Sequence, residues 1–277
     1  KNEVLSLGYG DKPIYGGISR TAVGGEVGEL YGWAIDGIFQ NQSEIDALND
    51  GSPIGRYQEE ATAPGDFKFR DTNGRGADGL LTGQPDGKID DDDRIYLGSA
   101  IPNLYFGLNI NMAYKGFDLS VLASGVSGNK IFNGLRSSLE NGAGWDNYST
   151  NMLNRWTPDN TDTDVPRVVM YDPNKNGRSS SRWLEDGSYL KITTVQLGYN
   201  IPQSILSKVK LSKVRVYVTG QNLYTFTDYS GFDPDFGSDG LTDRAVDQGA
   251  YPNKAFTAFA GGLPNPRTVL FGLQIGL

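Results

Sequence analysis

Residues 104–125 read LYFGLNINMAYKGFDLSVLASG, and this stretch decides the fold. From Leu104 to Ala113, apolar residues alternate with polar or small ones, which is typical of a β-strand that has one apolar face. A second alternating run starts at Phe117, directly after the pair Lys115 and Gly116. Such a pair between two strands is typical of a tight hairpin turn. The stretch therefore predicts an antiparallel hairpin with strands of about ten residues.

Three further strands follow the same period-two pattern. One spans 190–199, where the apolar positions change parity, and this change predicts a β-bulge near Thr193 and Thr194. The others span 214–221 and 269–277, and a short helical segment at 204–209 precedes the first of them.

The connections between these strands differ in length. Those at 115–116 and 200–213 are short, whereas those at 126–189 and 225–267 are long and polar. Long connections at one end and short ones at the other are typical of outer-membrane β-barrels. The pattern thus predicts an all-β chain that forms a transmembrane antiparallel β-barrel with long extracellular loops.

Alternation alone also fits a soluble β-sandwich, in which one face of each strand packs inward. The length of the strands, the unequal connections and the aromatic residues near the strand ends favour the barrel. No stretch of the sequence is long and apolar enough to be a membrane helix.

Composition narrows the range of functions. The 277 residues include no Cys and no His, which excludes disulfides, catalysis by Cys or His, and metal centres built on Cys. There are 25 basic against 33 acidic residues, a net charge of −8, which argues against nucleic acid as a partner. Two acidic pairs, Glu185 with Asp186 and Asp233 with Asp235, are candidates for glycosidase chemistry. Carboxylates in turns are more often structural, so the sequence predicts no enzyme.

Residues 66–94 form an acidic, glycine-rich segment that resembles a calcium loop split by an insertion. When 75–85 is looped out, the two remaining pieces have the spacing of an EF-hand loop. The predicted calcium ligands are Asp71, Asn73, Asp86, Asp90 and Asp93, because carboxylate and amide oxygens suit a hard cation. The alternative is a solvated turn whose Asp and Asn side chains cap their own backbone. No other cofactor is expected, and none is required.

Beyond these patterns, the chain resembles the C-terminal part of the SusC/RagA family of TonB-dependent outer-membrane transporters of Bacteroidota. The resemblance covers nearly the whole chain and rests on ordered blocks of sequence. These blocks are VGELYGWAIDGIFQ (27–40), GDFKFRDTNG (65–74), DGKIDDDDRIYLGSAIPNLYFGLNINMAYKGFDLSVLASG (86–125), GNKIFN (128–133), NRWTPDNTDTDVPR (154–167), SRWLEDGSYLKITTVQLGYNIP (181–202), KVRVYVTGQNLYTFTDYSGFDPD (213–235) and NPRTVLFGLQIGL (265–277).

This resemblance implies a barrel of about 22 strands around an N-terminal plug. It also implies a SusD-like lipoprotein that opens like a lid to admit glycans or peptides, and import driven through TonB, ExbB and ExbD. Residues 1–277 include neither the plug nor the N-terminal strands, so we expect one C-terminal barrel segment of a longer transporter. The rest of the barrel would pair with both sheet edges, and lipid would cover the outside. Leu277 is a departure, because the family usually ends in an aromatic residue.

On this interpretation the polar face of the strands lines the aqueous interior of the barrel. The predicted lumen-facing residues along the substrate path are Asn109, Asn111, Asp118, Ser120, Arg215, Tyr217, Thr219 and Gln221. No catalytic residue is predicted. The alternative function is a soluble, calcium-bound, β-rich module that binds glycan or adheres to cells.

Overall fold

The computed structural model describes residues 2–8, 10–144, 147–209, 211–235, 246–247 and 265–276. Within these ranges the chain divides into two compact units. The strand unit comprises 101–130, 186–235 and 265–276, and the small-sheet unit comprises 2–100, 131–185 and 246–247.

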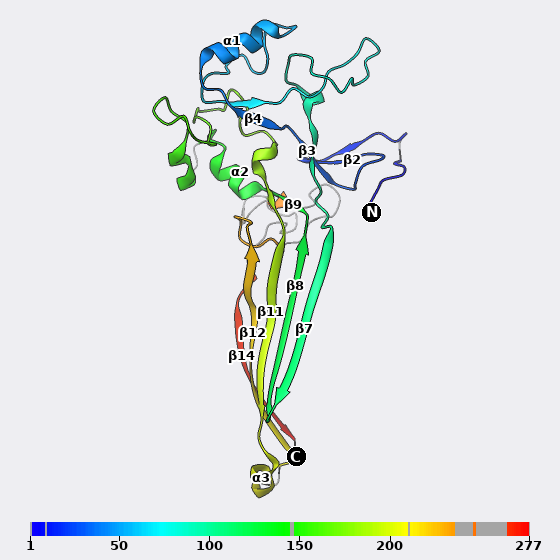
Figure 1. Cartoon of the computed structure of the whole chain (residues 1–277), viewed down its shortest axis with the longest axis vertical. Helices are drawn as coiled ribbons and strands as arrows, with labels where there is room; N and C mark the ends of the chain where they lie inside the picture. The colour runs from blue at the N-terminus through cyan, green and yellow to red at the C-terminus, as the bar shows by residue number, and fades with distance from the viewer. Residues whose placement is uncertain are drawn as a thin grey trace. The chain divides into compact units, whose positions relative to one another are not determined.

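The strand unit is a five-stranded antiparallel sheet with the order β14-β12-β11-β8-β7, whose long strands lie side by side in Figure 1. Its strands are β7 (Leu104–Tyr114), β8 (Phe117–Ser127), β11 (Tyr189–Asn200), β12 (Lys213–Thr227) and β14 (Thr268–Gly276). The strands expected from the sequence are therefore confirmed, and β12 extends further than its alternating core suggests. Leu277, which was expected to end the last strand, lies outside the described residues.

The β7–β8 hairpin turns at the predicted pair. Lys115 and Gly116 both have positive φ, 48° and 89°, which is the conformation of a type I′ turn. Glycine suits position 116 because a φ of 89° strains residues with a side chain, and a Cβ there would also lie 3.1 Å from the carbonyl oxygen of Asn200. The predicted bulge is also confirmed, since the pairing of β11 with both neighbours shifts between Ile192 and Thr194. The extra residue keeps the apolar side chains of β11 on one face throughout.

The register gives the sheet two chemically different faces, because residues paired directly across strands point the same way. The apolar face carries Phe106, Leu108, Ile110, Met112, Leu119, Val121, Leu190, Val195, Leu197, Val216, Val218, Phe271, Leu273 and Ile275. Much of this face is open, since Leu108 is 54% exposed and Leu273 is 58% exposed. A β-sandwich would bury such a face, so the exposure favours the barrel.

Aromatic rings lie at both ends of the apolar face. Phe117 and Tyr199 pack with ring centroids 4.6 Å apart at the hairpin end, and Tyr224 and Phe226 do the same at the other end. Paired positions place these two clusters about eight residues apart along the strands, which is about 26 Å at the usual rise. With the aromatic positions included, this length suits the roughly nine to eleven residues of a tilted membrane strand, and the two clusters suit the aromatic girdles of outer-membrane barrels.

The predicted helical segment between β11 and β12 is present as α3 (Gln203–Leu206) followed by a 3-10 turn, η4 (Ser207–Val209). It lies at the same end of the sheet as the hairpin turn, where the Asn200 N–H donates to the Gly116 carbonyl. The short connections therefore share one end of the sheet. The long connection at 225–267 lies mainly outside the described residues.

The small-sheet unit has strands of two to four residues in its described part. One sheet has the order β1 (Ile14–Tyr15), β2 (Ser19–Thr21), β3 (Glu29–Gly32) and β6 (Ile95–Gly98). A second pairs β4 (Ile35–Ile38) with β5 (Phe67–Phe69), and a third has the order β10 (Leu184–Asp186), β9 (Lys130–Asn133) and β13 (Val246–Asp247). The helical elements are α1 (Gln42–Gly51), α2 (Gly134–Glu140), η1 (Asp91–Asp93), η2 (Thr150–Asn154) and η3 (Ser181–Trp183).

Two small apolar clusters stabilise this unit. Ile18, Leu30 and Ala100 form the first, and Phe39, Ile45 and Tyr57 form the second, to which α1 contributes Ile45. Among the described helices, none is long and apolar enough to cross a membrane.

Candidate functional site

The polar face of the five-stranded sheet gathers all eight residues that the sequence predicted along the substrate path. Asn111 pairs with Ser120 across β7 and β8, and Asn109 is two residues away on the same face. On β12, the alternating positions from Arg215 to Gln221 pair with residues of β11 that share this face. We call this set, together with Gln196, Gly198 and Asn200, the polar face. Its role as a lumen lining is taken up below.

Asp118 and Arg215 form an ion pair that crosses the central strand β11. The Arg215 Nε donates to the Asp118 Oδ1 at 3.0 Å, and a second nitrogen of the guanidinium contacts Oδ2. The bridge passes over Gly198, where a Cβ would lie 2.5 Å from the guanidinium and 2.6 Å from the carboxylate. Glycine at this position therefore leaves room for a bidentate pair between strands that are not neighbours.

The ion pair continues into a chain of amides and hydroxyls. Arg215 also donates to the Gln196 Oε1 at 2.9 Å, and the Gln196 Nε2 donates to the Thr219 Oγ1 at 2.9 Å. Asn200 donates to the Asp118 Oδ1 at 3.2 Å. Linked donors and acceptors of this kind hold side chains in defined positions along the face.

Tyr217 lies flat across the neighbouring strand. A Cβ at Gly272 of β14 would lie 2.0 Å from the ring, and the Arg215 guanidinium stands 4.8 Å from the ring centroid. The Tyr217 ring therefore covers Gly272 on β14 and makes a cation–π contact with Arg215 on its own strand, β12. On β7, the Asn111 amide donates to Asn109 at 3.0 Å, and both side chains are exposed.

Three members of the polar face were missed from the sequence, namely Gln196, Gly198 and Asn200. The signal was present, because once the bulge is placed at residues 193 and 194, every second residue of β11 must share the face of Asp118 and Arg215. Gly198 was missed because glycine has no polar side chain that would mark the position as part of a polar face.

The two acidic pairs considered for catalysis serve as ion-pair partners. Glu185 accepts from Arg136 at 3.3 Å, and Asp186 lies 3.8 Å from the Lys130 ammonium. Asp233 and Asp235 both bind Lys191, at 3.1 Å and 3.0 Å, and the Lys191 side chain is only 3% exposed. These contacts give the carboxylates structural roles.

The acidic segment folds as the split loop that the sequence suggested, because its two pieces meet. The Asp71 carboxylate accepts the N–H groups of Asp86 and Gly87, at 3.1 Å and 2.6 Å. The intervening insertion closes on itself, with Thr82 donating to the Gly74 carbonyl at 2.9 Å. The structure therefore places Asp71 next to Asp86.

Asp93 is the most buried of the predicted calcium ligands, with no exposed surface. Its carboxylate accepts the N–H groups of Thr72, Asn73 and Asp90, at 2.8, 3.2 and 2.7 Å. Burial raises the pKa of Asp93 to about 6, although these three hydrogen bonds act in the opposite direction.

The other predicted calcium ligands are bound by groups of the chain itself, namely a lysine side chain and backbone N–H groups. The Lys88 ammonium contacts both Asp86 and Asp90, and the Asn73 side chain accepts the Gly83 N–H at 2.7 Å. Among the described residues, no group of three acidic side chains is arranged to hold a metal ion. The loop as arranged is held by backbone N–H groups and by Lys88, and calcium binding stays a prediction.

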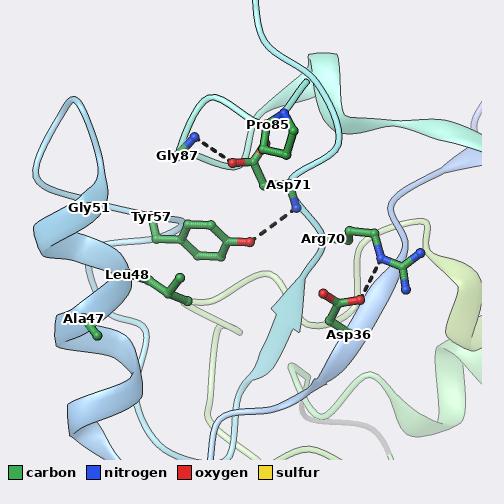
Figure 2. Close-up of a pocket in the computed structure, with 9 residues that line it drawn as sticks. All are labelled: Asp36, Ala47, Leu48, Gly51, Tyr57, Arg70, Asp71, Pro85 and Gly87. Atoms are coloured by element: carbon green, nitrogen blue, oxygen red, sulfur yellow. Dashed lines mark hydrogen bonds and ion pairs between the residues drawn. The ribbon is translucent and has the colours of Figure 1, made fainter. Parts of the chain in front are cut away.

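A pocket of about 340 Å³ lies beside this loop in the small-sheet unit (Figure 2). The apolar part of the lining comes from Ala47 and Leu48 of α1, the Tyr57 ring and Pro85. The charged part comes from Asp36, Arg70 and Asp71, while Gly51 and Gly87 complete the lining. The Arg70 Nε donates to the Asp36 Oδ1 at 2.7 Å. The pocket was not expected from the sequence, because α1, β4 and the acidic loop meet only in the fold.

Known proteins match this chain in both sequence and structure. TonB-dependent receptor P3 of Formosa agariphila is 35% identical over 243 residues, which cover 84% of this chain and 22% of that receptor. TonB-dependent receptor P26 of the same organism is 32% identical over 286 residues, which cover 99% of this chain and 26% of the receptor. SusC of Bacteroides thetaiotaomicron is 24% identical over 194 residues, covering 69% of this chain and 18% of SusC.

A solved structure of the RagAB peptide transporter matches with a TM-score of 0.70 and 22% identity, covering 99% of this chain and 26% of that one. No family model matches the chain. The chain spans about a quarter of the length of the first two receptors and of the solved structure.

Long antiparallel strands with one exposed apolar face and one polar face define the wall of a transmembrane β-barrel. The matched fold agrees, so the strand unit is a segment of such a wall. The chain belongs to the TonB-dependent receptors, in the family of SusC and RagA.

Proposed function

We propose that this chain is the C-terminal part of the barrel of an outer-membrane active importer that depends on TonB. The observation that carries the proposal is the five-stranded sheet, whose open apolar face suits lipid and whose polar face suits water. Its relatives are named receptors, and the matched structure is a peptide transporter, which supports import rather than catalysis.

In this importer the polar face lines the path of the substrate. The network from Asn200 through Asp118, Arg215, Gln196 and Thr219 presents alternating donors and acceptors to water and to a polar solute. A lining of this kind tunes passage through a barrel. The substrate is a glycan or a peptide, and the long connections at 126–189 and 225–267 face the outside of the cell.

The partners of this importer follow from its place in the membrane. A SusD-like lipoprotein covers the outer opening, and TonB with ExbB and ExbD supplies energy from the inner membrane. The remainder of the barrel and the plug complete the wall and fill it. Membrane lipid contacts the apolar face, and nucleic acid is not among the proposed partners.

Fractionation of cells tests the location and the partners together. The protein is tagged in its host, membranes are separated and extracted with detergent, and everything that copurifies is identified by mass spectrometry. We expect recovery from the outer membrane together with further barrel polypeptide and a SusD-type lipoprotein. Recovery as a water-soluble, monodisperse species of 30.1 kDa would instead favour the calcium-bound binding module.

Uptake measurements test the activity itself. Cells that lack the gene are supplied with labelled oligosaccharides and labelled peptides in parallel, next to cells that lack TonB. Loss of uptake of one substrate class in both strains is the expected result. Normal uptake of every substrate class in the gene-deleted cells would contradict the proposal.

A further inference from the structure

The pocket in Figure 2 is lined by both apolar and charged side chains. Its volume of about 340 Å³ is at the small end of ligand sites, and its apolar lining includes Leu48, the Tyr57 ring and Pro85. Tyr57 is only 8% exposed, and its hydroxyl group donates to the Phe69 carbonyl at 2.8 Å and accepts the Asp71 N–H at 3.3 Å. The ring therefore serves the pocket as an apolar surface.

The charged lining of the pocket has two carboxylates, Asp36 and Asp71, against one guanidinium, Arg70. Because Asp71 accepts the N–H groups of Asp86 and Gly87, Asp36 is the carboxylate that can meet a cation, and it shares this role with Arg70. The C-terminal half of α1 also lines the pocket, and this ten-residue helix has no basic residue in its last turn. The end of a helix that carries free carbonyl groups attracts cations.

The charged groups of the pocket are accessible from outside. The Asp36 side chain is 35% exposed and the Arg70 side chain 53% exposed, and the single short contact between them joins the Arg70 Nε to the Asp36 Oδ1. In Figure 2 this pair and the Tyr57 ring lie on facing sides of the space. A ligand with an apolar stem and a cationic tip could contact both sides at once.

We propose that this pocket binds a basic side chain, of the lysine type, on a peptide substrate of the importer. The stem packs on Leu48, Tyr57 and Pro85, and the ammonium lies against Asp36. The inference rests on the proposed import function and names the substrate class that the pocket selects. Arg70 competes with the ammonium of the ligand for the Asp36 carboxylate. Removal of Arg70 should therefore strengthen binding, whereas removal of Asp36 should weaken it.

The experiment measures binding of small peptides to the purified full-length receptor in detergent by saturation-transfer NMR. The probes are acetyl-Gly-Lys-Gly-amide, the same peptide with norleucine, which keeps the stem without the charge, and maltotriose. We expect the lysine peptide to bind about tenfold more tightly than the norleucine peptide, with an advantage that shrinks at high salt. Equal binding of the two peptides, or binding of maltotriose alone, would overturn the proposal.

Three charge variants make the test specific. Asp36→Asn should weaken binding of the lysine peptide about fivefold, and Arg70→Gln should strengthen it about threefold, because Asp36 is released from its partner. Asp162→Asn, on an exposed loop of the same unit, is the matched control and should leave binding unchanged. Equal effects of Asp36→Asn and Asp162→Asn would overturn the assignment.

Two further measurements keep the interpretation clear. The thermal midpoint of each variant is compared with that of the parent, so that lost binding is not mistaken for lost structure. Recovery of the receptor from the outer membrane is measured separately. A receptor that reaches the outer membrane but does not discriminate lysine from norleucine overturns the pocket assignment alone.

Discussion

At the scale of single residues, the small-sheet unit depends on buried polar side chains more than on a large apolar core. Asn174 is fully buried and accepts hydrogen bonds from Gln58 at 2.6 Å and Thr62 at 2.7 Å. Its own amide donates to the Phe67 carbonyl at 3.1 Å and to Asn176 at 2.8 Å. One amide thus joins segments that are more than 100 residues apart in the chain.

Replacing Asn174 should therefore destabilise this unit. Asn174→Ala removes four hydrogen bonds from a buried network, although the Gln58 amide keeps the Phe67 carbonyl and Thr62 keeps the Glu59 carbonyl as acceptors. We expect a loss of about 2–4 kcal/mol. Pulse proteolysis of the full protein in a urea series measures the loss. The matched control is Asn2→Ala, at an exposed position of the same unit, which should change the free energy of unfolding by no more than about 0.5 kcal/mol. Equal midpoints for the two variants would show that the network contributes nothing.

Asp93 is a second residue whose loss has a defined consequence. Its carboxylate accepts three backbone N–H groups that tie together both pieces of the acidic loop. Asp93→Ala should cost about 2–3 kcal/mol and increase cleavage of 71–93 by protease, whereas Asp78→Ala, in the exposed insertion, should not. The same assay with calcium and with a chelator tests the ion. Protection of the parent loop that depends on calcium would support the calcium prediction.

At the scale of elements, the single strand β7 has one apolar face and one polar face. All eleven of its residues are exposed in the described structure, and apolar and polar side chains alternate along it. Leu108 pairs with Ala123 on the apolar face, and the next residue, Asn109, pairs with Leu122 on the polar face. Adjacent positions of this strand should therefore respond in opposite ways to a charge.

The pair Leu108→Arg and Asn109→Arg tests this difference. Arginine at Leu108 would lie in lipid near the middle of the strand and should cost about 2–4 kcal/mol, which impairs insertion. Arginine at Asn109 would point into water and should be tolerated. Heat-modifiable mobility of the receptor in outer-membrane preparations measures folding. Normal assembly of Leu108→Arg would reverse the assignment of the faces.

At the scale of the whole molecule, the sheet needs further strands on both sides. Within the described residues, β7 pairs with β8 and β14 pairs with β12, so each outer strand has one partner. An unpaired strand edge in lipid leaves backbone N–H and carbonyl groups without hydrogen bonds, which costs several kcal/mol for each group. On the proposed function, the remainder of the barrel would pair with both edges.

Hydrogen exchange should reveal these missing partners. In the complete receptor, backbone N–H groups of β7 and β14 should exchange as slowly as those of the central strand β11. In residues 1–277 produced alone in detergent, the outer strands should exchange at least about tenfold faster than β11, because their outer edges are unpaired. Equal slow exchange in both samples would mean that the segment closes on itself.

The sequence by itself determined the strands, the hairpin turn, the bulge and the chemical identity of the two faces. These features are local, because the alternation of side chains and the positive φ of Lys115 and Gly116 depend on neighbouring residues. The eight polar-face residues followed from the same alternation. The resemblance to TonB-dependent receptors was also stated from the sequence, and the comparisons confirm it.

Only the tertiary structure decided which of these residues touch. The Asp118–Arg215 bridge over Gly198 joins residues 97 positions apart, and it depends on the register of three strands. The buried amide network around Asn174 and the pocket beside Tyr57 likewise join distant segments. Period-two alternation tells which face a side chain is on, but not how far one strand slides along the next, and that offset selects the partners.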